Sequence, residues 1–154
     1  MYPQNTIYLY SNKYTVAMSI THIEHIGIAV KDLNETIPFY EQLLGTKCYN
    51  IEVVEDQKVK TAFFMVGQTK IELLEPTDPE GPIGKYIANK GEGIHHIAFA
   101  TTDVDGDLQC AEANGIRLID KTSRPGAEGL SIGFLHPKST HGVLTELCQD
   151  KNKK

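Results

Sequence analysis

The chain has 154 residues, 40% of them hydrophobic and 23% charged, which is ordinary for a globular protein of one domain or two small modules. Its 15 basic and 20 acidic residues give a net charge of −5, and the only basic run is the tail KNKK, which argues against a nucleic-acid partner. No apolar run approaches the roughly 18 residues that a membrane-spanning helix needs, so we expect no membrane partner.

The cysteines and the first 21 residues bear on location. Cys48, Cys110 and Cys148 are odd in number, far apart and without CxxC spacing, which predicts reduced thiols rather than disulfides or a zinc site. Residues 1–21 contain neither a continuous apolar core nor an arginine, unlike a secretory or transit peptide. We expect a flexible leader or a non-native extension, with Met18 as an alternative start. The expected location is the cytoplasm.

A first module is predicted over residues 22–77. The stretch HIGIAVKDL, beginning at His25, has the pattern of a strand that runs into a polar turn. A helix should follow, with Asp32 or Asn34 as its N-cap, Pro38 near its opening turn and Gly45 as its end. Strand-like segments come next and finish with KIELLEP at 70–76.

A Pro- and Gly-rich linker over 78–92, with a short helix around 83–89, should lead to a second module over 93–149. This module begins with a strand in GEGIHHIAFA at 91–100, and a helix is expected from Asp103 to Gly115. It finishes with the strand-like VLTELCQ, and residues 150–154 form a charged tail.

The two modules are similar to each other. HIGIAVKDL from His25 matches HIAFATTDV from His96, 71 positions later. Each module also ends on a glutamate within an apolar strand, and these residues, Glu72 and Glu146, are 74 positions apart. Because both the starts and the ends match at similar spacing, we predict an internal duplication.

The adjacent histidines of the second module need separate interpretations. In an extended strand His95 would share a face with bulky residues, while His96 would share one with Ala98 and Ala100. Alternation alone does not choose between them, and both could be ordinary packed or solvated side chains. The repeat pairs His96 with His25 and leaves His95 as a packed neighbour.

If the modules pack with pseudo-twofold symmetry, the paired histidines and glutamates converge inside one concave sheet. Two imidazoles and two carboxylates suit a divalent first-row metal such as Co, Mn, Ni, Fe or Zn. A metal would also explain why glutamates interrupt apolar strands, since a buried carboxylate without a partner is unfavourable. Taken singly, each glutamate could instead face solvent on a half-exposed strand.

Five segments, HIGIAVKDL, KIELLEP, GEGIHHIAFA, FLHPKS and GVLTEL, together resemble the methylmalonyl-CoA epimerase family of the vicinal oxygen chelate superfamily over roughly 22–149. The resemblance implies an α+β fold in which two paired βαβββ modules form a cupped mixed sheet around a metal site. It implies Co²⁺ as the metal, with Mn²⁺, Ni²⁺ or Zn²⁺ as alternatives, an acyl-CoA substrate and a homodimer. The implied metal ligands are His25, Glu72, His96 and Glu146.

The implied reaction interconverts (2R)- and (2S)-methylmalonyl-CoA, a step that feeds propionate metabolism. The C2 proton lies between a thioester and a carboxylate, so its removal yields an enolate, whose charge a metal could stabilise. Epimerisation then requires proton removal on one face of C2 and proton return on the other, for which two bases are the natural solution.

This chain departs from part of the family at two positions. Some members carry a glutamate, proposed as one of the two bases, where this chain has Thr61, and often a glutamine where it has Glu72. We therefore expect Glu72 to act as the second base opposite Glu146, each exchanging metal ligation for proton transfer. Thus these two residues are the predicted catalytic residues.

Contacts to the CoA phosphates should come from Lys or Arg side chains near the mouth of the cup. We expect them from Lys60, Arg124 and Lys138, although each could be a solvated surface charge. The segment RPGAEG at 124–129 also has the composition of a mobile loop that could close over substrate.

Two other functions fit the same fold. A glyoxalase I-like lyase acting on a glutathione hemithioacetal would use much the same ligands, and a non-catalytic binding protein could keep some of them. The segments HPKS and GVLTEL favour the epimerase over the lyase, and the intact set of four ligands argues against the binding protein.

Overall fold

The structure, a computed structural model, describes residues 17–153, so the expectations for residues 1–16 fall outside the described part. No helix in this part is long and apolar enough to cross a membrane. In chain order the elements are β1 Ile20–Ala29, α1 Leu33–Leu44, β2 Asn50–Val54, η1 Glu55–Gln57, β3 Val59–Val66, β4 Thr69–Pro76, α2 Pro82–Lys90, β5 Gly93–Thr101, α3 Val104–Ala113, β6 Arg124–Pro125, η2 Ala127–Gly129, β7 Ser131–Leu135, η3 Pro137–Ser139 and β8 Thr145–Gln149.

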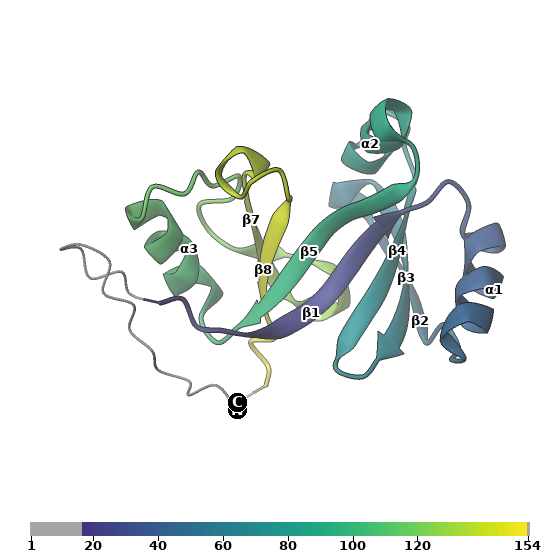
Figure 1. The fold of residues 1–154 in the computed structure, drawn as a ribbon, viewed down its shortest axis with the longest axis horizontal. Coiled ribbons are helices and arrows are strands. Elements are labelled where there is room, and N and C mark those ends of the chain that lie inside the picture. Colours follow the sequence, from purple (N-terminus) through teal and green to yellow (C-terminus); the bar gives the residue numbers. More distant parts are fainter. Residues whose placement is uncertain (1–16, 154) are drawn as a thin grey trace.

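All eight strands form one sheet in the order β2-β3-β4-β1-β5-β8-β7-β6. The antiparallel pair β1 and β5 lies at the centre, and each of these strands pairs in parallel with the last strand of its own module. The sheet curls, with α1 outside one end and α3 outside the other (Figure 1). The predicted α+β fold with a cupped mixed sheet, typical of vicinal oxygen chelate proteins, is confirmed.

The first helices of the two modules begin in the same way. Asp32 accepts a hydrogen bond from the Asn34 backbone N–H at 2.8 Å, and Asp103 accepts one from Gly106 at 3.0 Å. These side chains satisfy amide groups that lack a partner within the helix. The helix α1 ends at Gly45, whose φ of 65° places it in the left-handed region. Pro38 lies within α1 rather than in its opening turn.

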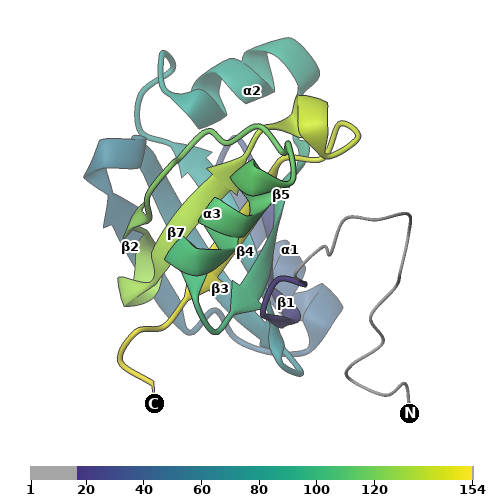
Figure 2. The same cartoon turned by 90° about the vertical axis from the view of Figure 1, so that its left-hand side faces the viewer.

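Each helix covers its own small core on the outer face of the sheet. The core at α1 contains Leu33 of the helix together with Val30, Ala62, Phe64 and Leu73. The core at α3 contains Val104, Leu108 and Ala111 of the helix together with Leu135 and Leu147. Figure 2 shows α3 packed across the outside of β7 and β8. Side chains of a strand alternate between the two faces of the sheet. The strand residues that do not join these outer cores therefore point into the cup. This leaves the inner face available for a site.

The regular pairing of the two central strands is interrupted within β5. Gly27 pairs with His96, but the next residue of β1, Ile28, pairs with Ile94. His95 is therefore the extra residue of a β-bulge, a feature that bends a strand and redirects its side chains.

Candidate metal centre and substrate cavity

The paired histidines and glutamates of the two modules meet inside the cup. The Nε2 atoms of His25 and His96 are 3.0 Å apart. Glu72 Oε2 lies 3.2 Å from His25 Nε2, and Glu146 Oε2 lies 3.3 Å from His96 Nε2. All four residues are at most 5% exposed, so these polar groups face one another rather than solvent.

Small residues on the central strands make this convergence possible. Gly27 of β1 pairs with both His96 and Glu72, and Ala98 of β5 pairs with both His25 and Glu146. A Cβ atom added to Gly27 would overlap the His96 ring, with Nε2 only 2.9 Å away. The His96 imidazole therefore lies across the backbone of β1, which requires glycine there.

The donor atoms fit a divalent first-row metal ion. One ligand atom from each of His25, His96 and Glu146 lies within 4.8 Å of the others. Glu72 Oε2 is also 3.6 Å from His96 Nε2. Both imidazoles turn Nε2 inward, while Nδ1 of His96 contacts Nδ1 of His95 at 3.0 Å and Nδ1 of His25 bonds to the Glu24 carboxylate. Outer partners of this kind commonly orient metal-binding histidines.

The charges of the four groups also fit a cation. Burial raises the pKa of Glu72 to about 7. Burial also lowers the pKa of His96 well below its ordinary value, and the neighbouring His25 lowers it further. For His25 burial acts in the same direction, but the carboxylates of Glu72 and Glu146 outweigh it and raise the pKa well above normal. In the protein alone a His25 proton balances the carboxylates; a divalent cation would replace it.

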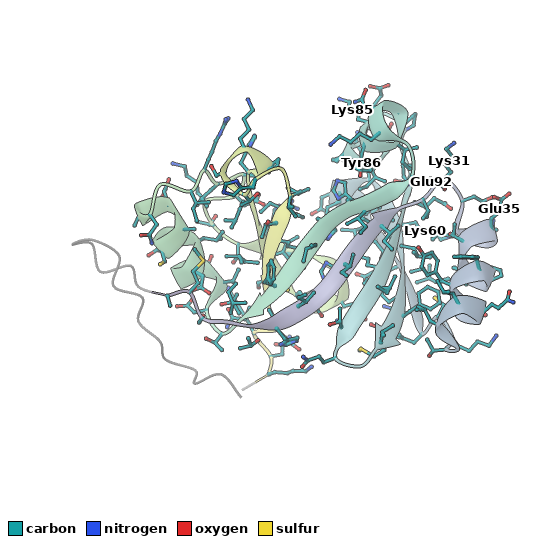
Figure 3. The ribbon with its side chains drawn as sticks, in the orientation of Figure 1. Lys31, Glu35, Lys60, Lys85, Tyr86 and Glu92 are labelled. Carbon is teal, nitrogen blue, oxygen red and sulfur yellow. The ribbon has the colours of Figure 1, made fainter. Side chains whose placement is uncertain are left out.

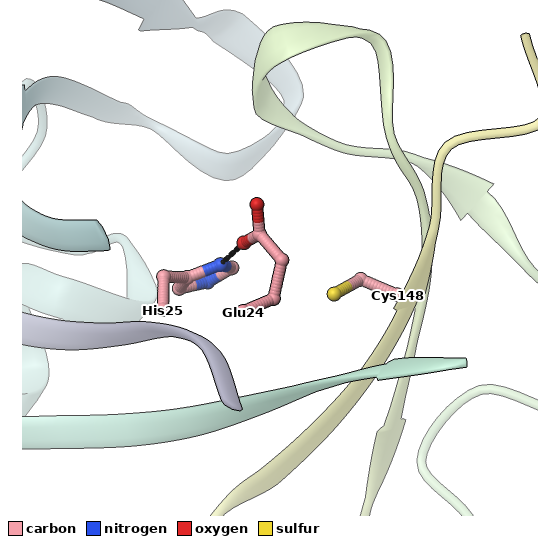
Figure 4. A group of neighbouring side chains, drawn as sticks. All are labelled: Glu24, His25 and Cys148. Carbon is pink, nitrogen blue, oxygen red and sulfur yellow. Dashed lines mark hydrogen bonds and ion pairs between the residues drawn. The ribbon is translucent and has the colours of Figure 1, made fainter. Parts of the chain in front are cut away.

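A second group of neighbouring side chains supports His25 from behind (Figure 4). Although burial raises the pKa of Glu24, its contacts with His25 and Lys70 outweigh that effect and lower it to about 2. The third member, Cys148, donates its thiol to the Phe99 carbonyl at 3.5 Å, and burial raises its pKa. Within this group Glu24 orients His25. With a protonated thiol and an occupied Nδ1, the group does not resemble a second metal site.

The four groups line a cavity of about 230 Å³. Most of its wall is apolar and a few polar groups project into it, as in pockets for small ligands. The apolar lining includes Val59, Phe63, Leu74, Ile83, Leu130, Ile132, Phe134 and Leu144. The other polar lining residues are Glu24, Gln57, Lys70, His95, Arg124 and Glu128.

Both adjacent histidines border this cavity, so the prediction that they lie on opposite faces was wrong. The bulge at His95 is the reason, because it breaks the alternation of the strand. The expectation that His95 is a packed neighbour of His96 is confirmed, since its ring also packs edge-on against Tyr86 with centroids 5.0 Å apart. Burial and the charge of Lys90 lower the pKa of His95 to about 4, so its ring is neutral at neutral pH.

The three cationic residues expected to contact CoA differ in whether they line the cavity. Arg124 lines the cavity, with its Nε donating to Asp120 Oδ1 at 3.0 Å. Lys60 alternates with Thr61 along β3 and lies on the side of the sheet that carries α1 (Figure 3), while Lys138 belongs to η3. Neither lysine is among the residues that line the cavity.

Thr61 is buried where some family members have a glutamate. Its side chain is 1% exposed, and its hydroxyl donates to the Glu52 carbonyl at 3.2 Å. The neighbouring inward positions of β3, Val59 and Phe63, line the cavity, whereas Thr61 does not. This strand therefore contributes no base to the cavity.

An ionic network that sequence reasoning missed crosses the cavity. Lys70 of β4 lies 2.5 Å from Glu24 and 3.2 Å from Glu128 of η2. Glu128 also accepts a hydrogen bond from the Tyr49 hydroxyl at 2.9 Å, and its backbone N–H donates to Glu52 at 2.9 Å. The loop expected to be mobile is thus fastened to the first module. No local sequence pattern links these partners, which are far apart in the chain.

Comparisons with known proteins agree with this geometry. Residues 24–134 match the family described as Glyoxalase/Bleomycin resistance protein/Dioxygenase superfamily. The mitochondrial methylmalonyl-CoA epimerase of Homo sapiens is 33% identical over 132 residues, covering 85% of this chain and 75% of that protein. An uncharacterised protein of Bacillus subtilis is 42% identical, covering 86% and 94%. A Streptomyces coelicolor methylmalonyl-CoA epimerase in complex with 2-nitronate-propionyl-CoA superposes with a TM-score of 0.83 at 43% identity, covering 86% and 96%.

Proposed function

This chain belongs to the glyoxalase/bleomycin resistance protein/dioxygenase superfamily, and we propose that it interconverts (2R)- and (2S)-methylmalonyl-CoA. The observation that carries the proposal is the pair of buried carboxylates, Glu72 and Glu146, which reach one largely apolar cavity from different modules. Two proton-transferring groups are what inversion at C2 requires.

The residues that line the cavity support assigning the proton transfers to these two groups. Four carboxylates line it, and Glu24 and Glu128 are both ion-paired with Lys70. Thr61 does not line it, and its hydroxyl is already bonded to the Glu52 carbonyl. By elimination, Glu72 and Glu146 are the proposed catalytic residues. One carboxylate takes the C2 proton and the other, in its acid form, returns a proton to the opposite face.

A divalent metal is part of the proposal. It would be held by His25, Glu72, His96 and Glu146, and we propose Co²⁺, with Mn²⁺, Ni²⁺ or Zn²⁺ as alternatives. When bound, the metal supplies a Lewis acid for substrate oxygens on which negative charge develops. The chain itself holds the ligand imidazoles in place through Glu24 and His95 and provides apolar walls that limit the access of water.

The remaining proposals concern the substrate, assembly and location. We propose that Arg124, Lys60 and Lys138 attract the anionic CoA substrate; of the three, Arg124 lines the cavity.

We also propose a cytoplasmic homodimer that takes part in propionate metabolism. Light scattering on the purified protein would measure its mass in solution, and a monomer would contradict the dimer.

One experiment tests the function directly. The protein is incubated with (2S)-methylmalonyl-CoA in D₂O, after treatment with a chelator and with or without added Co²⁺. We expect metal-dependent formation of the other epimer with deuterium at C2, followed by NMR, and no turnover of the methylglyoxal–glutathione hemithioacetal. No exchange under any condition would contradict the proposal, and turnover of the hemithioacetal alone would indicate the lyase.

A further inference from the structure

One polar group in the cavity is not explained by the metal centre. The side chain of Gln57, the last residue of η1, lines the cavity, and its Nε2 atom is buried without a hydrogen-bond partner among residues 17–153. Native proteins leave few buried donors unpaired, because such a group loses its hydrogen bonds to water without replacement. An orphaned donor that faces a cavity therefore suggests that a ligand supplies its acceptor.

The turn that carries Gln57 is firmly held. The next residue, Lys58, has a φ of 53°, a left-handed conformation that is unusual for lysine. Its backbone N–H donates to the Glu55 carbonyl, its own carbonyl accepts from Thr77, both at 3.0 Å, and its ammonium group pairs with Asp78 at 2.9 Å. The turn is thus bonded to the connection between β4 and α2, which presents the Gln57 amide in a fixed place.

The position of Gln57 along the cavity indicates which part of a substrate it meets. Phe63 of β3 pairs with Glu72, and Val59 lies four residues back towards Gln57. At about 3.3 Å per residue this is a displacement of about 13 Å along the strand from the level of the catalytic carboxylates. The cavity wall at this end includes Val59, Pro82 and Ile83. An acyl group at the carboxylates would leave this end for the chain that carries it.

We propose that Gln57 donates a hydrogen bond to an amide carbonyl of the pantetheine arm of the acyl-CoA substrate, which makes it a residue that positions the substrate. The inference rests on the proposed function and adds the route that the arm takes, between η1 and the start of α2. The pantetheine arm alternates methylene groups with secondary amides. An apolar wall with a single amide donor is complementary to such a chain.

The test uses three methylmalonyl thioesters: that of CoA, that of pantetheine and the S-propyl thioester, which lacks the amides. Replacing Gln57→Leu removes the donor at similar volume, and Gln68→Leu, in the exposed turn between β3 and β4, is the matched control. We expect Gln57→Leu to lower kcat/KM roughly 3- to 10-fold for the CoA and pantetheine thioesters, the effect of one hydrogen bond. The S-propyl thioester should react equally well with both variants.

An equal loss on all three thioesters would place Gln57 at the acyl group and overturn the proposal. A loss confined to the CoA thioester would do the same, because it would indicate contact with the nucleotide. If the wild-type protein epimerises none of the thioesters, the proposed function fails, and a binding measurement then decides the route of the arm.

That measurement is an NMR titration with propionyl-pantetheine, which has no carboxylate and cannot be epimerised. The side-chain amide signals of Gln57, identified by their absence from the spectrum of Gln57→Leu, should shift as the ligand binds. If signals of other cavity residues shift to saturation while those of Gln57 stay in place, the proposal is wrong.

Discussion

The two halves of the candidate metal centre place their histidines alike but support them differently. In the first module Nδ1 of His25 meets the Glu24 carboxylate, which is itself paired with Lys70. In the second, His96 lies among rings: His95, and Phe134 with its centroid 5.6 Å away. Burial favours a neutral His96, whereas the carboxylates of Glu72 and Glu146, with a smaller contribution from Glu24, raise the pKa of His25 and favour its charged form. The two modules thus place equivalent histidines alike and surround them with different residues.

The largest effect should come from a change at Gly27. The equivalent residue of the second module, Ala98, differs from it by one methyl group. Gly27→Ala would push a Cβ into the His96 ring, so we expect loss of the metal and, with it, of nearly all the activity. Ala98→Gly at the equivalent place should keep the metal and lose only about 1 kcal/mol of stability. Metal content by mass spectrometry of the intact protein checks both. A Gly27→Ala variant that retains metal and activity would show that the close approach is not needed.

Replacing Glu72 and Glu146 one at a time should show which carboxylate acts on which face of C2. In Glu72→Gln and in Glu146→Gln we expect epimerisation to fall roughly 10²- to 10⁴-fold, because each variant loses one proton-transferring group. Each variant should still exchange the C2 proton of one epimer in D₂O, and the two variants should favour opposite epimers. Unchanged epimerisation by Glu72→Gln with metal retained would leave Glu72 as a ligand only.

The unequal supports of the histidines should appear in metal affinity. Glu24→Gln removes the charge behind His25, and we expect metal binding to weaken roughly 10- to 100-fold, as for other outer partners of metal-bound histidines. His95→Gln, behind His96, should weaken it less, because the group lost there is a neutral ring. Titration calorimetry on metal-free protein measures both affinities. Equal losses would mean that the two supports act alike.

The smallest effect tests a feature that the modules share. Asp32→Ala and Asp103→Ala each remove the N-cap of a helix, so each should lower the free energy of unfolding by about 1 kcal/mol. Metal affinity should not change, because both helices lie outside the cup. Urea unfolding followed by circular dichroism measures the stabilities, and a marked difference between the two variants would show that only one of the helices depends on its cap.

Local sequence patterns predicted most of the fold, because helix caps, helix ends and strand alternation depend on residues that are adjacent in the chain. Asp32 as one of two candidate N-caps, a helix starting at Asp103, the end of α1 at Gly45 and a helix in the linker were readable from residues adjacent in the chain. The repeat then indicated which histidines and glutamates are equivalent. The bulge at His95 was not readable, because it depends on the pairing of β5 with β1 rather than on either strand alone.

The sequence by itself determined the duplicated pattern, the secondary structure and the residue types available for a metal, since these follow from periodicity and composition. Tertiary structure decided that His95 turns towards the cavity, that Arg124 lines it while Lys60 does not, and that Lys70 joins Glu24 to Glu128. It also exposed the unpaired amide of Gln57. These are contacts between residues distant in the chain, and folding brings them together through the curl and register of the whole sheet.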